Sequence, residues 1–80
     1  MYESVWLSMF TNRYEGTWKA GMKHGRGAET FPDGEKYDGE WVADKRHGHG
    51  MCRYADGSVY DGHWLEGQKN GQGKMRHASE

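Results

Sequence analysis

Short stretches in which apolar and polar residues alternate dominate the chain, and glycine-rich turns separate them. The stretch YEGTW, in residues 14–18, places its two aromatic residues and its glycine on one face at a period of two. The stretch GRGAETF likewise places Gly25, Gly27 and Phe31 on one face. This pattern predicts a hairpin of two antiparallel strands joined by the short polar loop KAGMKH. No stretch shows the apolar stripe of a helix.

The same hairpin pattern occurs three times at a spacing of 23 residues. Five positions hold the same residue type in every copy: Tyr14, Tyr37 and Tyr60; Gly16, Gly39 and Gly62; Trp18, Trp41 and Trp64; Gly25, Gly48 and Gly71; Gly27, Gly50 and Gly73. A fixed period of this length indicates small stacked units, none of which buries a face alone. The sequence therefore predicts an all-β antiparallel meander of about six strands, with repeats at residues 14–36, 37–59 and 60–80.

The glycines beside the aromatic residues leave room for the rings. A ring on one face of a sheet can cover the notch left by a neighbouring or opposite glycine and shield the backbone there. We expect the Tyr and Trp rings to lie over Gly16, Gly39 and Gly62, so that ring burial offsets the entropic cost of ordering glycine. The segments PDG and ADG, at residues 32–34 and 55–57, are typical of tight turns whose glycine adopts a positive φ.

Three consecutive segments resemble MORN (membrane occupation and recognition nexus) repeats: YEGTWKAGMKHGRGAETFPDGEKY, YDGEWVADKRHGHGMCRYADGSVY and YDGHWLEGQKNGQGKMRHASE. The family pattern is Y-x-G-x-[WF], a loop, [HN]-G-x-G, an aromatic residue and a D-G turn. The resemblance implies a single-layer, twisted, elongated antiparallel sheet with a groove along one face. It also implies a module that scaffolds other proteins, often near membranes or the cytoskeleton, and that forms dimers in some cases.

The two ends of the chain depart from the repeat. Residues 1–13 do not fit the period, but SVWLSMF alternates within them. We expect this segment to be a degenerate strand that pairs with the strand beginning at Tyr14 and caps that edge. At the other end, HASE stands where the first two repeats have their turns, so the third repeat, residues 60–80, is truncated or degenerate. We expect the strand around residues 71–75 to be an open edge that invites pairing with a second copy.

The composition indicates one small folded domain. The 80 residues include four Trp, five Tyr and two Phe, which is too many for a solvated linker. The net charge of −1 provides no basic field for nucleic acid, so we expect no nucleic-acid partner. The single cysteine, Cys52, suits a reducing compartment, and no apolar run approaches the roughly 20 residues of a membrane span. We therefore expect a cytoplasmic protein, associated with the cytoskeleton or a membrane in line with the resemblance.

The residue types that carry chemistry form no catalytic or cofactor-binding pattern. GRG, GHG and GQG are not phosphate loops, because no GxxxxGK[ST] motif occurs. Equivalent residues of neighbouring repeats lie two strand spacings apart, about 10 Å, which is too far to share a metal ion. We expect no enzyme activity, no cofactor and no metal. His24 and His47 are interpreted as partners of backbone groups at the junction of loop and strand, and Cys52 as an ordinary sheet position. The remaining histidines, His49, His63 and His77, are likewise not expected to bind metal.

Two sets of residues are candidates for binding. A single-layer sheet has no second layer to cover its rings, so we expect exposed ring edges to mark a site for a partner peptide or helix. The predicted partner-binding residues are Tyr14, Trp18, Phe31, Tyr37, Trp41, Tyr54, Tyr60 and Trp64. Basic residues near one end of each hairpin form the second set, which suits an anionic phospholipid surface. These are Lys19, Lys23, Lys45, Arg46 and Lys69.

The favoured function is a non-enzymatic interaction or scaffolding module. It binds a partner peptide or helix along the aromatic groove, or a second copy by pairing of a free sheet edge. The alternatives are a peripheral phospholipid-binding module that uses the basic loops, and an ancillary repeat segment of a larger enzyme. Because interface energy concentrates in central aromatic residues, the first reading predicts that replacing Trp41 weakens partner binding most.

Overall fold

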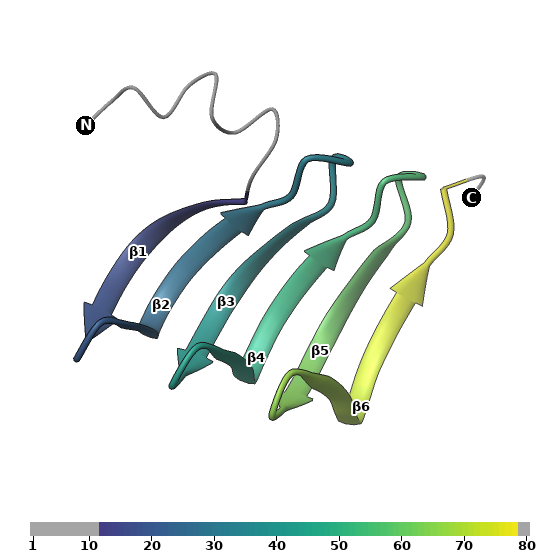
Figure 1. The fold of residues 1–80 in the computed structure, drawn as a ribbon. Coiled ribbons are helices and arrows are strands. Elements are labelled where there is room, and N and C mark those ends of the chain that lie inside the picture. The colour runs from purple at the N-terminus through teal and green to yellow at the C-terminus, as the bar shows by residue number, and fades with distance from the viewer. Residues whose placement is uncertain (1–11, 79–80) are drawn as a thin grey trace.

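Residues 12–78, which the computed structural model describes, form one antiparallel sheet of six strands (Figure 1). The strands are β1 (Arg13–Lys19), β2 (Met22–Thr30), β3 (Lys36–Val42), β4 (Lys45–Arg53), β5 (Val59–Leu65) and β6 (Gln68–Arg76). Each strand pairs with the next in chain order, and this part of the chain contains no helix. The predicted all-β meander is confirmed. The capping strand expected in residues 1–13 falls almost entirely outside the described residues.

Two-residue turns join the strands of each hairpin. The sequence-based prediction of a longer polar loop at this place is wrong. Residues 22–24 of KAGMKH already belong to β2, and only Ala20 and Gly21 form the turn. Both turn residues have positive φ, 53° and 78°, and the two other hairpins repeat this arrangement. Two central residues with positive φ are the mark of a type I′ turn, whose twist matches that of the strands it joins.

The connections between hairpins are the tight turns that PDG and ADG predicted. Gly34 has a φ of 100° and donates its N–H to the carbonyl oxygen of Phe31 at 3.0 Å. The carboxylate of Asp33 accepts the N–H of Glu35 at 2.9 Å, which closes the turn from the other side. The second turn has the same two bonds: the N–H of Gly57 donates to the Tyr54 carbonyl oxygen, and the N–H of Ser58 donates to the Asp56 carboxylate. The bond from Ser58 holds the pKa of the Asp56 carboxyl below its usual range.

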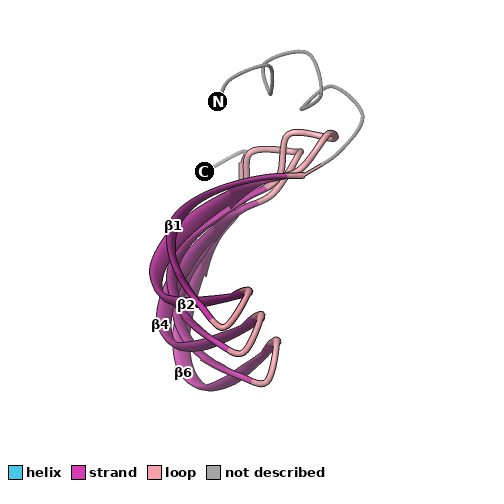
Figure 2. Cartoon of the chain, turned by 60° about the vertical axis from the view of Figure 1, so that its left-hand side comes forward, coloured by secondary structure: helices cyan, strands magenta, loops and turns pink. Residues whose placement is uncertain are grey.

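An irregularity at the same place in each hairpin bends the sheet. Gly16 pairs with Gly27 and Trp18 pairs with Lys23, so one residue of β1 faces three residues of β2. Gly25 lies in that bulge and has a φ of 90°, and a Cβ there would point at Thr17. The prediction that Gly25 shares a face with Gly27 and Phe31 by simple alternation is therefore wrong. Because bulges increase local bend and twist, all strands arch together and the sheet becomes a trough (Figure 2).

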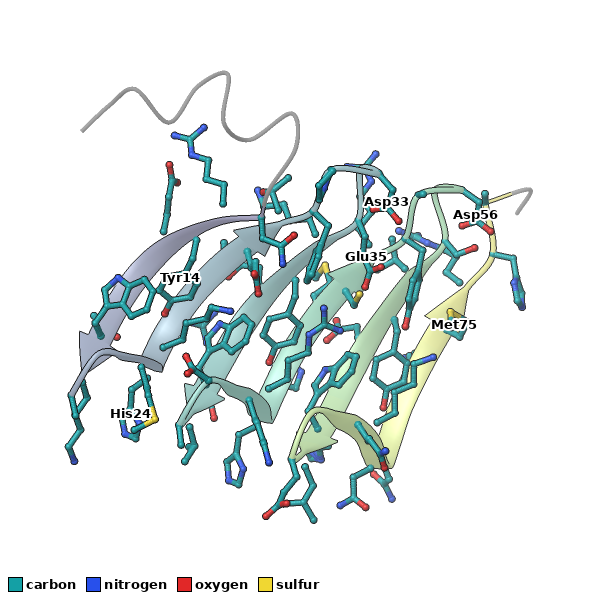
Figure 3. The ribbon with its side chains drawn as sticks, in the orientation of Figure 1. Tyr14, His24, Asp33, Glu35, Asp56 and Met75 are labelled. Atoms are coloured by element: carbon teal, nitrogen blue, oxygen red, sulfur yellow. The ribbon has the colours of Figure 1, made fainter. Side chains whose placement is uncertain are left out.

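The core is a single row of rings on the hollow side of this trough, the trough face. This is the side turned toward the viewer in Figure 1, and Figure 3 shows Tyr14 lying on it. Tyr37 is fully buried and Trp41 is 3% exposed, although no second layer covers them within residues 12–78. The expected glycine notches explain this burial. A Cβ at Gly50 would lie within the ring of Tyr37, and one at Gly39 would lie 2.6 Å from its hydroxyl oxygen.

Candidate functional site

The rings on the trough face form one continuous series of contacts, which we call the aromatic ladder. Within each repeat the Tyr and Trp rings meet edge to face, and each Tyr of the first two repeats also meets the Trp of the next repeat. Centroid separations are 4.8 to 5.5 Å, the range in which edge-to-face pairs are stabilising. In spatial order the ladder is Trp18, Tyr14, Trp41, Tyr37, Trp64 and Tyr60.

Hydrogen bonds fix the polar ends of these rings. The indole N–H of Trp41 donates to the carbonyl oxygen of Gly27 at 3.0 Å, and Trp64 donates to Gly50 at the same distance. Both bonds cross from one repeat to the one before it. The Tyr37 hydroxyl donates to the carbonyl oxygen of Glu40 at 2.9 Å, and burial raises the pKa of Tyr37 from 10.0 to about 12. The buried rings of Tyr37, Trp41 and Trp64 therefore each have a hydrogen-bond partner for their polar group.

Three basic side chains lie across the ladder at the period of the repeat; we call Lys23, Arg46 and Lys69 the cation row. Each approaches the Tyr ring of its own repeat, Lys23 at 5.8 Å, Arg46 at 4.7 Å and Lys69 at 5.0 Å from the centroid. Lys23 and Arg46 also lie 5.0 Å from the Trp ring of the following repeat. These are cation–π distances, so the basic heads and their aliphatic stems form the lid over the rings.

Carboxylates neutralise two members of the cation row. Lys23 pairs with Glu29, a buried residue, at 3.1 Å, and Arg46 pairs with Glu35 at 3.4 Å. The positions equivalent to these carboxylates near Lys69 hold Ser58 and Met75, and Lys69 forms no ion pair within residues 12–78. Within residues 12–78 the trough therefore changes from charge-paired cations in its first two repeats to a cation without an ion pair in its third.

Cys52 lies beneath Arg46 and is fully buried. Its Sγ donates to the Glu35 carboxylate at 3.3 Å, and burial together with this bond raises the pKa of the thiol. A protonated, enclosed thiol is a poor nucleophile. The interpretation of Cys52 as an ordinary sheet position agrees with this environment.

The eight predicted partner-binding residues differ widely in accessibility. Four of them are buried in the sheet itself, namely Tyr37, Trp41, Tyr60 and Trp64. Tyr14, Phe31 and Tyr54 are half-buried, and Trp18 is 56% exposed. Exposed ring surface is thus found at the margins of the trough and not at its centre. The role of these residues in partner binding stays a prediction, but a partner at the centre meets the cation row and not the indole of Trp41.

The five basic residues predicted for lipid contact fall on two different surfaces. Lys23, Arg46 and Lys69 lie inside strands β2, β4 and β6, over the rings, because the turns are shorter than the sequence suggested. Lys19 and Lys45 stay exposed at the hairpin-turn end. Sequence reasoning missed the cation row as a column, although its members are 23 residues apart and the alternation of β2 puts Lys23 on the same face as Gly27.

The hairpin-turn end carries an exposed apolar strip beside its lysines. Val42 and Leu65 occupy the same position in successive repeats, each directly after the buried Trp, and both side chains are exposed. Lys45 pairs with Val42 across the β3–β4 turn. Acidic residues at the turns, Asp44 and Glu66, dilute the positive charge.

On the outer face, opposite the rings, lies an open hollow of about 640 Å³. His49 and His63 face each other there across β4 and β5, with ring centroids 5.9 Å apart. His49 Nε2 lies 3.0 Å from a carboxylate oxygen of Asp61. No group of three or more His, Cys, Asp or Glu side chains among residues 12–78 is arranged to hold a metal ion. Residues 12–78 also contain no helix that is long and apolar enough to cross a membrane.

Comparison with known proteins supports the repeat assignment. No curated protein matches the chain. The family model of the MORN repeat matches three consecutive segments, residues 14–36, 37–59 and 60–79, and these contain every ring of the ladder and every member of the cation row. Since the matched segments cover most of the 80 residues, the chain belongs to the MORN repeat family.

Proposed function

We propose that this protein is a non-enzymatic interaction module whose trough face binds an acidic segment of a partner protein. MORN repeats are in general modules that interact with proteins or membranes. The observation that carries the proposal is the cation row: three basic heads at the repeat spacing cover the centre of the trough, where the rings are inaccessible. A partner that lies along the trough therefore meets basic head groups first and ring edges only at the margins.

The spacing of the cation row suits a regular peptide. Its members come from every second strand, so their backbones are about 10 Å apart. Residues seven apart in an α-helix are separated by roughly 10.5 Å, and residues three apart in an extended chain by about 10 Å. A helix with a carboxylate at every seventh position therefore presents all of them to the cation row along one face, whereas residues three apart in an extended chain point to opposite faces.

Donors remain free for such a ligand. An ammonium carries three N–H donors and a guanidinium five, and the pairs with Glu29 and Glu35 use only part of them. Lys69 has no carboxylate partner within residues 12–78. We infer that the acidic end of a partner is held most strongly at the third repeat and that binding weakens with salt.

The test uses synthetic peptides as the probe. A helical peptide with Glu at every seventh position, its Gln counterpart and a shuffled version are titrated into the protein, with tryptophan fluorescence as the signal. The test variants are Arg46→Gln and Lys69→Gln. The matched control is Lys45→Gln, which removes the same charge from the neighbouring residue on the opposite face. Circular dichroism establishes that each variant is folded.

We expect each test variant to weaken binding of the Glu peptide by about tenfold, the usual scale of one charged hydrogen bond, and the control to bind as the parent does. Lys69→Gln keeps the test decisive if Arg46→Gln proves unstable, because Lys69 pairs with no carboxylate in the described part. Equal affinity for the Glu and Gln peptides, or an equal effect of Lys45→Gln, contradicts the proposal.

A lipid surface is the second candidate, and the apolar strip beside Lys19 and Lys45 favours it. Exposed Val42 and Leu65 next to lysines are suited to the boundary between headgroups and acyl chains. This reading predicts that Val42→Gln together with Lys45→Gln abolishes sedimentation with phosphatidylserine vesicles, while Arg46→Gln leaves it unchanged. The acidic-peptide proposal thus assigns binding to Arg46 and not to Lys45, and the lipid proposal assigns it to Lys45 and not to Arg46.

A further inference from the structure

Each repeat holds the next through the same small set of contacts. Trp41 of the second repeat donates its indole N–H to Gly27, packs edge to face on Tyr14 and lies under Lys23. Trp64 of the third repeat makes the equivalent contacts with Gly50, Tyr37 and Arg46. We call the Tyr ring, glycine carbonyl and cation of one repeat its Trp socket.

The two outer strands of the described sheet carry the two halves of this contact. Tyr60, Gly73 and Lys69 form a third Trp socket, and no Trp from residues 12–78 fills it. All of β6 is exposed. At the other edge Trp18 is 56% exposed, whereas Trp41 and Trp64, which occupy sockets, are 3% and 4% exposed.

We propose that the protein associates head to tail: β1 of a second copy pairs with β6, and its Trp18 enters the socket formed by Tyr60, Gly73 and Lys69. This pairing uses the edge of β1 that residues 1–13 were expected to cap, so the two arrangements exclude each other. This proposal does not rest on the acidic-peptide function, although both use Lys69, so an incoming Trp18 and an acidic peptide compete for that side chain. The occupant is a second copy because the chain itself supplies a strand with the required Y-x-G-x-W sequence.

The register of the contact follows from the two internal ones. Gly27 pairs with Gly39, and Gly50 pairs with Gly62, so Gly73 pairs with Gly16 of the second copy. Two glycines face each other at every such boundary. The N–H of the second turn residue also donates across each internal boundary, as Gly67 does to the Arg46 carbonyl. At the proposed boundary, the corresponding donor is Gly21 and the acceptor is Lys69.

The proposed pairing places one pair of opposite charges and one pair of like charges directly opposite each other. In this register Lys74 of β6 lies opposite Glu15 of the second copy, a position where the internal boundaries place Ala28 or Met51 opposite an aspartate. Opposite charges at directly paired positions are stabilising. Arg76 meets Arg13, which is unfavourable; Arg13 is paired at 2.6 Å with Glu15, so this one carboxylate lies between the two basic groups Arg13 and Lys74.

A head-to-tail contact has a distinct consequence for assembly. Each copy added through β1 still presents its own β6, so growth does not stop at a dimer. Pairing of two β6 edges, by contrast, is self-complementary and closes as a dimer. The size distribution and its response to blocking one edge therefore separate the two modes.

The experiment is sedimentation velocity on the full chain over a range of concentrations, with two blocked variants. Trp18→Ala removes the indole that enters the socket. The double variant Lys69→Glu with Lys74→Glu places carboxylates against the incoming ring and Glu15. Circular dichroism checks the fold of each, and Val42→Ala, an exposed residue away from both edges, is the matched control.

We expect the parent and the control to form a series of oligomers that lengthens with concentration, and each blocked variant to lose about thirtyfold or more in self-affinity. An equimolar mixture of the two blocked variants should form a dimer and nothing larger, because one retains a functional β6 and the other a functional β1. A parent that stays monomeric at millimolar concentration overturns the proposal. A closed dimer, or association unaffected by Trp18→Ala, overturns it as well.

Discussion

Replacing Gly39 by alanine adds a single methyl group at the tightest point of the sheet. A Cβ at Gly39 would lie 2.6 Å from the Tyr37 hydroxyl oxygen and 2.7 Å from the carbonyl oxygen of His49, and closer still to the Cα of Gly50. Two of these three neighbours are backbone atoms of β4. A backbone cannot rotate away as a side chain does, so β3 and β4 must separate locally for Gly39→Ala to be accommodated.

The expected cost is a large part of the stability of the domain. Overpacking costs about 1–3 kcal/mol. Displacement of the Tyr37 hydroxyl from the Glu40 carbonyl loses a hydrogen bond worth about 1 kcal/mol. We therefore expect Gly39→Ala to lower the free energy of unfolding by about 2–4 kcal/mol, from a total of roughly 4–12 kcal/mol for a domain of this length.

The matched control is Gly34→Ala. Gly34 has a φ of 100° and no atom within 4 Å of an added Cβ, so this variant measures backbone strain alone, about 1 kcal/mol. Urea unfolding followed by tryptophan fluorescence gives both free energies. If the two variants unfold with the same free energy, the close approach of β3 and β4 does not limit residue size and the reasoning is wrong.

Double-mutant cycles in the first repeat test whether an added Cβ is opposed by the Tyr14 ring or by backbone atoms. The three nearest atoms to a Cβ at Gly27 all belong to the Tyr14 side chain, whereas those at Gly16 are mainly backbone atoms. Tyr14→Ala should therefore relieve much of the cost of Gly27→Ala and little of the cost of Gly16→Ala. Equal coupling energies in the two cycles would refute the assignment.

Three further predictions concern the ladder and the cation row. Trp41→Phe should lower the free energy of unfolding by about 2–3 kcal/mol, through loss of its hydrogen bond and packing, and Trp18→Phe by less than about 0.5 kcal/mol, as urea unfolding will measure. The folded pKa of Tyr37, about 12, exceeds its unfolded value of 10.0, so its contribution to stability is complete below pH 10 and is lost as the pH rises toward 12. This contribution is on the order of 3 kcal/mol. The free energy of unfolding, measured against pH, should therefore fall less steeply above pH 10 in Tyr37→Phe than in the parent. Ser58→Glu should recreate beside Lys69 the pairing found at Arg46 and Glu35, and should weaken binding of the Glu peptide in fluorescence titration without affecting the Gln peptide.

The period and the spacing of rings and glycines were sufficient to predict the fold. A column of Tyr, Gly and Trp at alternate positions has one physical solution on an antiparallel sheet, in which the ring covers the glycine, and Tyr37 over Gly39 and Gly50 adopts it. The tight turns at Gly34 and Gly57 were equally predictable, because Asp-Gly sequences favour the positive φ that they show.

The hairpin turns and the cation row were not predicted, for a common reason. Ala20, Ala43 and Glu66 adopt positive φ, which their own preferences disfavour and which strand pairing on both sides imposes. Without the two-residue turn, the polar residues after it were interpreted as loop. Once the turn is fixed, Lys23 falls opposite Trp18 and its side chain must lie over the rings.

The burial of the ladder changes where specificity can reside in this protein. Positions that are identical in all three repeats, such as Tyr37 and Trp41, are occupied in holding the sheet together and have almost no surface to offer. The accessible positions of the trough are those that differ between repeats: the cation is Lys23, then Arg46, then Lys69, the carboxylate paired with it changes position, and the third repeat has none within residues 12–78. Two charge-paired repeats followed by an unpaired cation therefore make the two ends of the described trough electrostatically different.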